Sequence, residues 1–186
     1  MKEFFKSRFR IKGLQLRDFI IIAMLISLEI VFNRFLSINA WNIKIGFGFL
    51  PVALVAYKYG SIYAAITAAL SDFIGAIMFP IGPYFPGFTV VYALMGIIFG
   101  LFLYKNRKTV NTILAAVISG VVCTLLLTTL CITILYKGSY VPILISRLPQ
   151  FAFTTVVEII IFRYLYVFDL VYKRLPNKKK QGEINA

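Results

Sequence analysis

The sequence lacks histidine and has little acidic charge, and both absences narrow the chemistry it can support. Its 186 residues include no histidine and only seven aspartates and glutamates. Histidine-based catalytic triads and histidine metal sites are therefore excluded, and the scattered carboxylates do not have metal-ligand spacing. A Walker A phosphate-binding segment is absent as well. The sequence predicts no catalytic residue, no metal site and no cofactor, and it disfavours a membrane enzyme.

Cysteine is scarce too, with Cys123 and Cys131 as the two examples. They lie in one apolar run, and eight residues of helix separate them by about 12 Å at about 1.5 Å per residue. A disulfide within that helix is excluded by this distance. We expect both cysteines to be small packing residues.

What the sequence has in abundance is apolar residues, at 60% of the chain and a mean hydropathy of +0.86. Such a composition indicates an integral membrane protein. The net charge of +13 does not indicate nucleic-acid binding, because the basic residues gather at the ends of apolar runs. We expect the lipid bilayer as the environment and no nucleic acid as a partner.

Six apolar runs predict an all-α bundle of six transmembrane helices. They span approximately residues 18–37, 46–57, 62–79, 88–104, 109–136 and 143–171, and basic segments at residues 1–17 and 172–186 flank this membrane domain. The second run is short for a hydrocarbon core of about 30 Å and contains Pro51, so we expect a tilted, kinked or partly buried helix.

The distribution of lysine and arginine predicts that both termini are cytoplasmic. Residues 1–17 hold six of them, the loop after the fourth span holds three, and the C-terminal tail holds five. The other side has only Arg34, Lys44, Lys137 and Arg147. By the positive-inside rule, the connections at residues 38–45, 80–87 and 137–142 lie outside, where they can roof a pocket.

The stretch from Ser71 to Thr89 combines an aspartate with a rigid aromatic turn inside a very apolar chain. A carboxylate such as Asp72 costs roughly 2.5 kcal/mol or more in a bilayer and usually faces the bundle interior. Three prolines stiffen the turn, and Tyr84, Phe85 and Phe88 offer flat faces for stacking a planar ligand. The competing interpretation is an ordinary interhelical turn with interfacial aromatic residues.

One face of the last span carries polar groups. Arg147, Phe151, Thr154 and Glu158 recur on it at helical spacing, and Gln150 is adjacent. A cation, an amide and an aromatic ring are thus expected together near the outer mouth. Arginine and glutamine together can read carboxylates or the polar edge of a heterocycle. For Glu158 we favour a partner on a neighbouring helix over contact with a ligand.

The first span carries two separate features. Ala23 and Ser27 lie four residues apart, the spacing that permits close approach of another helix, either a partner subunit or a helix of the same bundle. Glu29 and Asn33 lie on a different face. Arg34 is near the outer end, where it can face a site or extend to the lipid headgroups.

Four strings give the chain a resemblance to a known family. They are KIGFGFLPV at residues 44–52, DFIGAIMFPIGPYFPGFT at 72–89, LFLYK at 101–105 and RLPQ at 147–150. In a six-span chain of this length they resemble the folate-specific S components, the substrate-binding subunits, of energy-coupling-factor (ECF) transporters. The resemblance covers nearly the whole chain.

This resemblance implies a fold, a function and partners. It implies a six-helix bundle in a bacterial cell membrane that binds folate from outside with high affinity. It further implies delivery through a membrane coupling subunit and two cytoplasmic ATPases, as an ATP-driven importer. We expect the pterin ring between aromatic and polar groups and the glutamate tail nearer the extracellular mouth.

The residues implied in these roles are assigned by position. Ala23 and Ser27 match the small-residue motif that meets the coupling subunit. The substrate-binding candidates are Arg34, Gly46, Phe47, Gly48, Phe49, Asp72, Tyr84, Phe85, Phe88, Arg147 and Gln150.

Two alternatives remain open at the level of sequence. One is an S component for another planar vitamin, such as riboflavin. The other is a proton-coupled secondary transporter that uses Asp72, Glu29 and Glu158 as a relay. Uptake by this chain alone, driven by a pH gradient, would favour the second.

Overall fold

The computed structural model describes the backbone of residues 15–40, 43–104 and 109–174, and it describes side chains at 15–37, 46–104 and 109–164. Most of the two basic terminal segments therefore lies outside the described residues. The described elements are α2 (Leu16–Arg34), β1 (Ile38–Ala40), β2 (Ile43–Ile45), α3 (Phe49–Tyr59), α4 (Ser61–Met78), α5 (Pro86–Leu103), α6 (Thr109–Ser119), η1 (Gly120–Leu127), α7 (Thr128–Tyr136) and α8 (Tyr140–Arg174).

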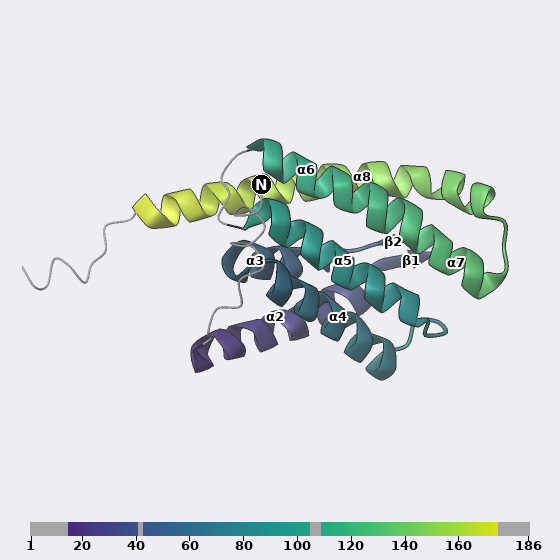
Figure 1. The fold of residues 1–186 in the computed structure, drawn as a ribbon, viewed down its shortest axis with the longest axis horizontal. Helices are drawn as coiled ribbons and strands as arrows, with labels where there is room; N and C mark the ends of the chain where they lie inside the picture. The colour runs from purple at the N-terminus through teal and green to yellow at the C-terminus, as the bar shows by residue number, and fades with distance from the viewer. Residues whose placement is uncertain (1–14, 41–42, 105–108, 175–186) are drawn as a thin grey trace, which may run out of the picture.

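The predicted helical bundle is confirmed, with one addition (Figure 1). Four helical segments are long and apolar enough to cross a membrane: Ser61–Met78, Pro86–Leu103, Thr109–Tyr136 and Tyr140–Tyr164. The helix Phe49–Tyr59 is apolar but shorter, and α2 has 19 residues that include both acidic and basic side chains. With α6, η1 and α7 continuous, the described chain forms six helices.

The addition is a two-stranded antiparallel hairpin where the sequence predicted only a connection. Ile38 pairs with Ile45, Asn39 with Lys44, and Ala40 with Ile43. Isoleucine at three of the six paired positions favours extended backbone. The all-α prediction therefore holds for the bundle and misses this short sheet.

Pro51 does not kink its helix. The sequence placed the start of the second span at residue 46, but α3 begins at Phe49, which puts Pro51 in the first turn. There a missing N–H group costs nothing, because the first backbone donors of a helix have no intrahelical partner. The short helix is instead largely buried among its neighbours, which confirms the prediction of partial burial.

Helix α5 lies at the centre of the bundle and packs against α3, α4, α6, η1 and α7. Its closest neighbour is α4. A Cβ atom built on Gly100 would lie 2.2 Å from the Cα atom of Ser61, so only glycine permits this approach. Next to it, Phe99 is fully buried and packs edge-to-face on Phe162, with 5.2 Å between ring centroids.

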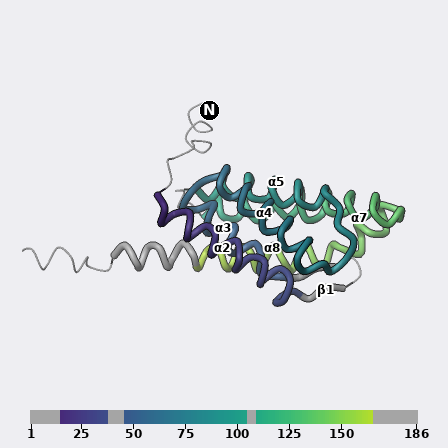
Figure 2. Tube along the Cα trace, turned by 90° about the horizontal axis from the view of Figure 1, so that it is seen from below, coloured from purple at the N-terminus to yellow at the C-terminus, as the bar shows by residue number. Residues whose placement is uncertain are grey.

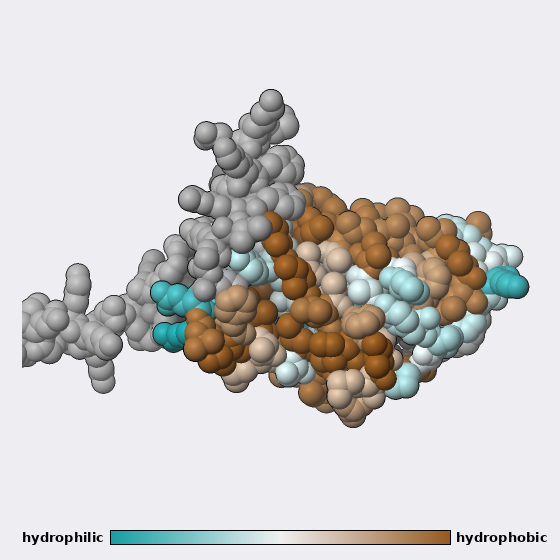
Figure 3. Space-filling model, turned by 60° about the horizontal axis from the view of Figure 1, so that its bottom comes forward, coloured by the Kyte–Doolittle hydropathy of each residue, from teal (hydrophilic) through white to brown (hydrophobic). Residues whose placement is uncertain are grey.

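The outer surface of the bundle is strongly apolar. Large hydrophobic side chains are exposed along α2, α4, α5, α7 and α8, and Figure 3 shows them over much of one side of the molecule. A water-soluble protein rarely exposes apolar surface on this scale. The chain is therefore a multi-pass membrane protein whose outer side chains face lipid.

Three connections gather at one end of the bundle, which we call the hairpin end. The β1–β2 hairpin, the loop between α4 and α5, and the turn between α7 and α8 all lie there, as the first two views show (Figures 1 and 2). The opposite end carries the start of α2 and the turn from α3 to α4. The three connections that the sequence placed on one side of the membrane are thus together in space.

Candidate ligand-binding site

A cavity of about 320 Å³ extends from the hairpin end into the bundle. Pockets for small organic ligands generally range from about 300 to 1,000 Å³. Residues from α2, α3, α4, α5, η1, α7 and α8, together with the loop between α4 and α5, line its wall. The cavity thus collects side chains from nearly every helix.

On the side of α2 and α4, the polar groups of the wall are bonded to each other. The Nη2 atom of Arg34 lies 3.8 Å from Oδ1 of Asp72, and Thr89 donates its hydroxyl hydrogen to Oδ2 of Asp72 at 2.8 Å. A Cβ atom on Gly75 would lie 2.9 Å from Nε of Arg34, so glycine makes room for the guanidinium group. This set of contacts connects α2, α4 and α5.

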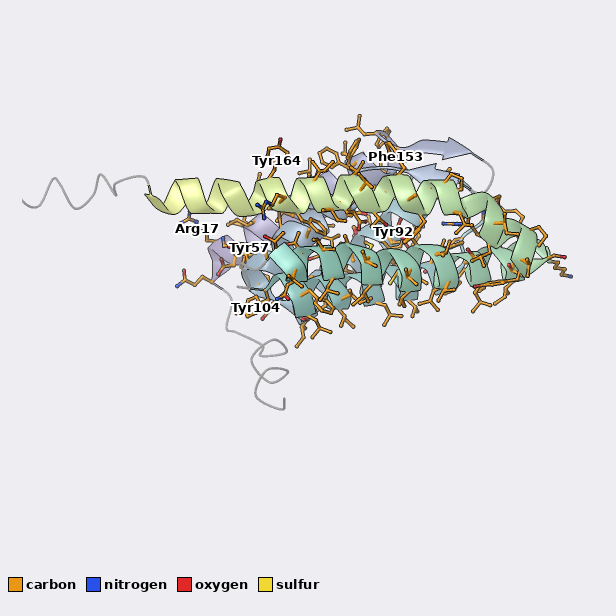
Figure 4. The ribbon with its side chains drawn as sticks, turned by 90° about the horizontal axis from the view of Figure 1, so that it is seen from above. Arg17, Tyr57, Tyr92, Tyr104, Phe153 and Tyr164 are labelled. Atoms are coloured by element: carbon orange, nitrogen blue, oxygen red, sulfur yellow. The ribbon has the colours of Figure 1, made fainter. Side chains whose placement is uncertain are left out.

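A second bonded set lies beside it. Asn33 donates to Oε1 of Glu29 at 2.8 Å and to the hydroxyl oxygen of Tyr92 at 3.3 Å. Tyr92 lies in the interior of the bundle, whereas Phe153 and Tyr164 project outward from α8 (Figure 4). We call these two sets, Arg34–Asp72–Thr89 and Glu29–Asn33–Tyr92, the paired networks.

On the side of α8, buried polar atoms lack partners. Nε of Arg147, Oγ1 of Thr154 and Oε2 of Glu158 accept or donate no hydrogen bond, and all three residues line the cavity. Arg147 is only 3% exposed, and no carboxylate of the described residues lies within 4.0 Å of it. We call Arg147, Thr154 and Glu158 the unpaired α8 face.

Unpaired buried polar groups are costly, at about 1–3 kcal/mol each and more when charged. Native proteins keep few of them, and those that persist often serve a function. Here they share one face of one helix and point to one cavity. This arrangement can bind an elongated ligand that carries hydrogen-bonding groups at several positions.

Aromatic side chains complete the wall near the hairpin end. Phe85 and Phe88 pack edge-to-face with 6.0 Å between centroids, and both line the cavity with Tyr84. The hydroxyl group of Tyr84 lies 3.1 Å from Oγ1 of Thr89, which joins the loop to the first paired network. Flat faces are therefore held at fixed positions beside the polar groups.

The structure brings most of the predicted site residues together at this cavity. Those that line it are Arg34, Gly46, Gly48, Phe49, Asp72, Tyr84, Phe85, Phe88, Arg147 and Gln150. Phe47 is 45% exposed and does not line the cavity, although Gly46 and Gly48 on either side of it do. Ala23 and Ser27 are exposed on α2, away from the cavity.

The geometry bears on two alternatives from the sequence. Arg34 does not extend to the headgroups, because its side chain is 10% exposed and pairs with Asp72. Glu158 has no cationic partner within 4.0 Å among the described side chains, and it lines the cavity. A neighbouring helix does place a partner against this carboxyl group, the Ser119 hydroxyl group on α6, as expected, but Oε2 of Glu158 has no hydrogen-bond partner.

Sequence reasoning missed several wall residues. Tyr92 gave no signal, because one tyrosine in an apolar span resembles any other. Cys123, Thr124 and Thr128 line the cavity from η1 and the start of α7, where a π-helix of eight residues interrupts the long helix. A π-helix changes which side chains share a face, so α-helical spacing could not have placed them. Cys123 was expected only to pack, and it is buried, without a disulfide, at the wall.

The comparison with known families identifies the class of protein. Residues 17–166 match the family model described as the substrate-specific component of ECF transporters. The chain belongs to this family, whose members are transporter components and not enzymes.

Two relatives and one solved structure are similar to this chain. The chain is 41% identical to the folate transporter FolT of Clostridium novyi over 132 residues, which cover 70% of this chain and 77% of that protein. It is 33% identical to the folate transporter FolT of Leuconostoc mesenteroides over 96 residues, or 52% and 51% of the two chains. A crystal structure of FolT bound with folic acid superposes with a TM-score of 0.77 at 30% identity, covering 81% of this chain and 93% of that one.

Proposed function

We propose that this chain is the high-affinity folate-binding subunit of an ECF importer. The observation that carries the proposal is the unpaired α8 face: a buried guanidinium, a hydroxyl and a carboxylate line one cavity together with three aromatic rings. Folate has a flat heterocycle at one end and carboxylates at the other, so it can satisfy both kinds of group. The similarity to folate transporters supports this ligand over riboflavin.

The ligand is oriented with the pterin ring deep in the bundle. Arg147 is near the start of α8, at the hairpin end, and its fork-shaped guanidinium suits a carboxylate of the glutamate tail. Tyr84, Phe85 and Phe88 flank the path between tail and ring. Arg34, Asp72, Gln150 and the glycines at 46 and 48 complete the wall.

The subunit lies in the bacterial cell membrane with both termini cytoplasmic. This orientation follows from the distribution of basic residues and puts the hairpin end outside, where it meets folate. Transport is driven by a coupling subunit and two ATPases, because the sequence has no phosphate-binding motif of its own. Ala23 and Ser27 are the contact with the coupling subunit, and their exposure on α2 supports this role over packing within the bundle.

Mass spectrometry of the ligand that stays bound through purification tests the proposal. We expect a folate from cells grown with folate, and a flavin would instead support the other planar-vitamin hypothesis. Proteoliposomes that contain only this chain provide the second test. We expect no uptake under a pH gradient, whereas uptake would show a secondary transporter.

A further inference from the structure

The deep end of the cavity contains one carboxylate whose role the fold does not explain. Glu158 is 3% exposed, and its Oε2 atom has no hydrogen-bond partner. Ser119 on α6 lies against this carboxyl group, but the Ser119 hydroxyl group donates to the carbonyl oxygen of Ala116 at 3.1 Å. The fold therefore leaves acceptor capacity of a buried carboxylate directed at the cavity.

The other buried carboxylates near the site are used differently. Asp72 pairs with Arg34 and accepts from Thr89, and Glu29 accepts from Asn33. An ionisable residue inside a membrane bundle is costly and generally functional. Of the two carboxylates that line the cavity, Asp72 pairs with Arg34, whereas Glu158 has no cation within 4.0 Å among the described side chains and an Oε2 atom without a hydrogen-bond partner.

The chemistry that satisfies such a group is a pair of adjacent N–H donors. The two oxygens of a carboxylate accept from two parallel donors, as they do from arginine. A pterin ring has this pair in its 2-amino group and its N3–H. The isoalloxazine ring of a flavin instead places its N3–H between two carbonyl oxygens, which a carboxylate repels.

The position along α8 agrees with this assignment. Glu158 lies eleven residues after Arg147, or about 16 Å at about 1.5 Å per residue. This separation is comparable with the length of folate from the pterin amino group to the glutamate carboxylates. A cation at the mouth and a carboxylate at the deep end thus match the two ends of one ligand.

We propose that Glu158 binds the 2-amino and N3–H edge of the pterin ring and thereby selects pterins over flavins. The inference rests on the proposed function, because it assumes that folate occupies the cavity. Thr154, one turn closer to Arg147, provides a further unpaired hydroxyl along the same path.

The test compares folic acid with its 2-desamino-2-methyl analogue by calorimetric titration of the purified chain. We expect the native chain to bind the analogue about 10- to 100-fold more weakly, because two charge-assisted bonds are reduced to one. Glu158→Gln should lower the affinity for folic acid by a similar factor and should bind folic acid and the analogue almost equally. Its amide is complementary to the carbonyl and N3–H of a flavin, so its preference for folic acid over riboflavin should also fall.

Glu29→Gln is the matched control, since it makes the same chemical change in a buried carboxylate outside the cavity wall. It should retain the native ratio between folic acid and the analogue. Equal weakening of both ligands by Glu158→Gln, or no weakening, would overturn the inference while folate binding itself stands. Should Glu158→Gln not fold, the native chain decides alone: equal affinity for folic acid and the analogue overturns the inference. If the native chain does not bind folic acid, the proposed function fails first.

Discussion

The two polar sides of the cavity differ in whether their buried groups are already bonded to each other. Among the residues that line the cavity on the side of α2 and α4, Arg34 pairs with Asp72 and Asn33 donates to Glu29. On the side of α8, Arg147, Thr154 and Glu158 each have a buried atom without a partner. On the proposed function, the bonded side stabilises the empty protein, whereas the unbonded side gains its partners from the ligand. Variants on the bonded side should therefore lower the stability of the ligand-free chain, and variants on the unbonded side should weaken ligand binding.

Asp72→Ala should have the largest effect on the chain itself. It leaves the Arg34 guanidinium buried without its carboxylate, and breaking a buried pair in this way costs about 3–5 kcal/mol. We expect a clearly lower thermal unfolding midpoint of the ligand-free chain in detergent. Replacing both Arg34 and Asp72 with leucine removes both charges and should recover most of that stability. Equal unfolding midpoints for Asp72→Ala and the native chain would show that the paired network is not structural.

Arg147→Ala should show the opposite pattern. It removes a charge that has no partner in the empty cavity, so the unfolding midpoint without ligand should be unchanged or higher. Folic acid affinity should fall at least tenfold, or about 1.4 kcal/mol, because a hydrogen bond to a charged group is worth about 1.5–3 kcal/mol. Arg147→Lys keeps the charge without the planar fork and should be intermediate. Unchanged affinity in folded Arg147→Ala would remove this residue from the site.

A smaller effect distinguishes two neighbouring threonines on α8. Both have a buried Oγ1 atom without a partner, but Thr154 lines the cavity and Thr155 lies near Gly120 on the facing helix. Thr154→Val should weaken folic acid by roughly 0.5–1.5 kcal/mol, the worth of a typical hydrogen bond. Thr155→Val should leave the affinity as it is. Calorimetry on both variants would contradict the account if Thr155→Val had the greater effect.

The smallest effect on the isolated chain is expected from leucine at both Ala23 and Ser27. These residues lie on the exposed side of α2, away from Glu29 and Asn33, so folic acid affinity should stay within about twofold of the native value. Uptake in cells that supply the coupling subunit and ATPases should nevertheless collapse, because close helix approach needs small residues. Lost affinity in the double variant would indicate packing within the bundle, and retained uptake would remove the coupling role.

Much of the fold could be predicted from the sequence because long apolar runs and prolines are local signals. The ends of the helices near Ser61, Thr109 and Tyr136 were placed within a residue of their positions in the structure. The hairpin at residues 38–45 was missed, since six residues of strand pairing are too few to give a periodic pattern. The π-helix at Gly120–Leu127 was missed because no spacing in the sequence announces it.

The site was predictable where a residue was unusual for its surroundings. A buried charge such as Arg34 or Asp72, or an aromatic turn such as that at Tyr84 and Phe85, stands out in an apolar chain. Tyr92 does not stand out, and its place at the wall depends on how α5 packs. Whether Glu158 has a partner also depends on which residues face it across the bundle, and tertiary packing alone decides that.

The central claim is that the unpaired α8 face is a folate site, and a calorimetric titration of the purified chain with folic acid and riboflavin tests it most directly. The account predicts saturable binding of one folic acid per chain, in the submicromolar range or tighter, and no comparable heat with riboflavin. Riboflavin bound as tightly as folic acid, or no binding of folic acid to the folded chain, would contradict it.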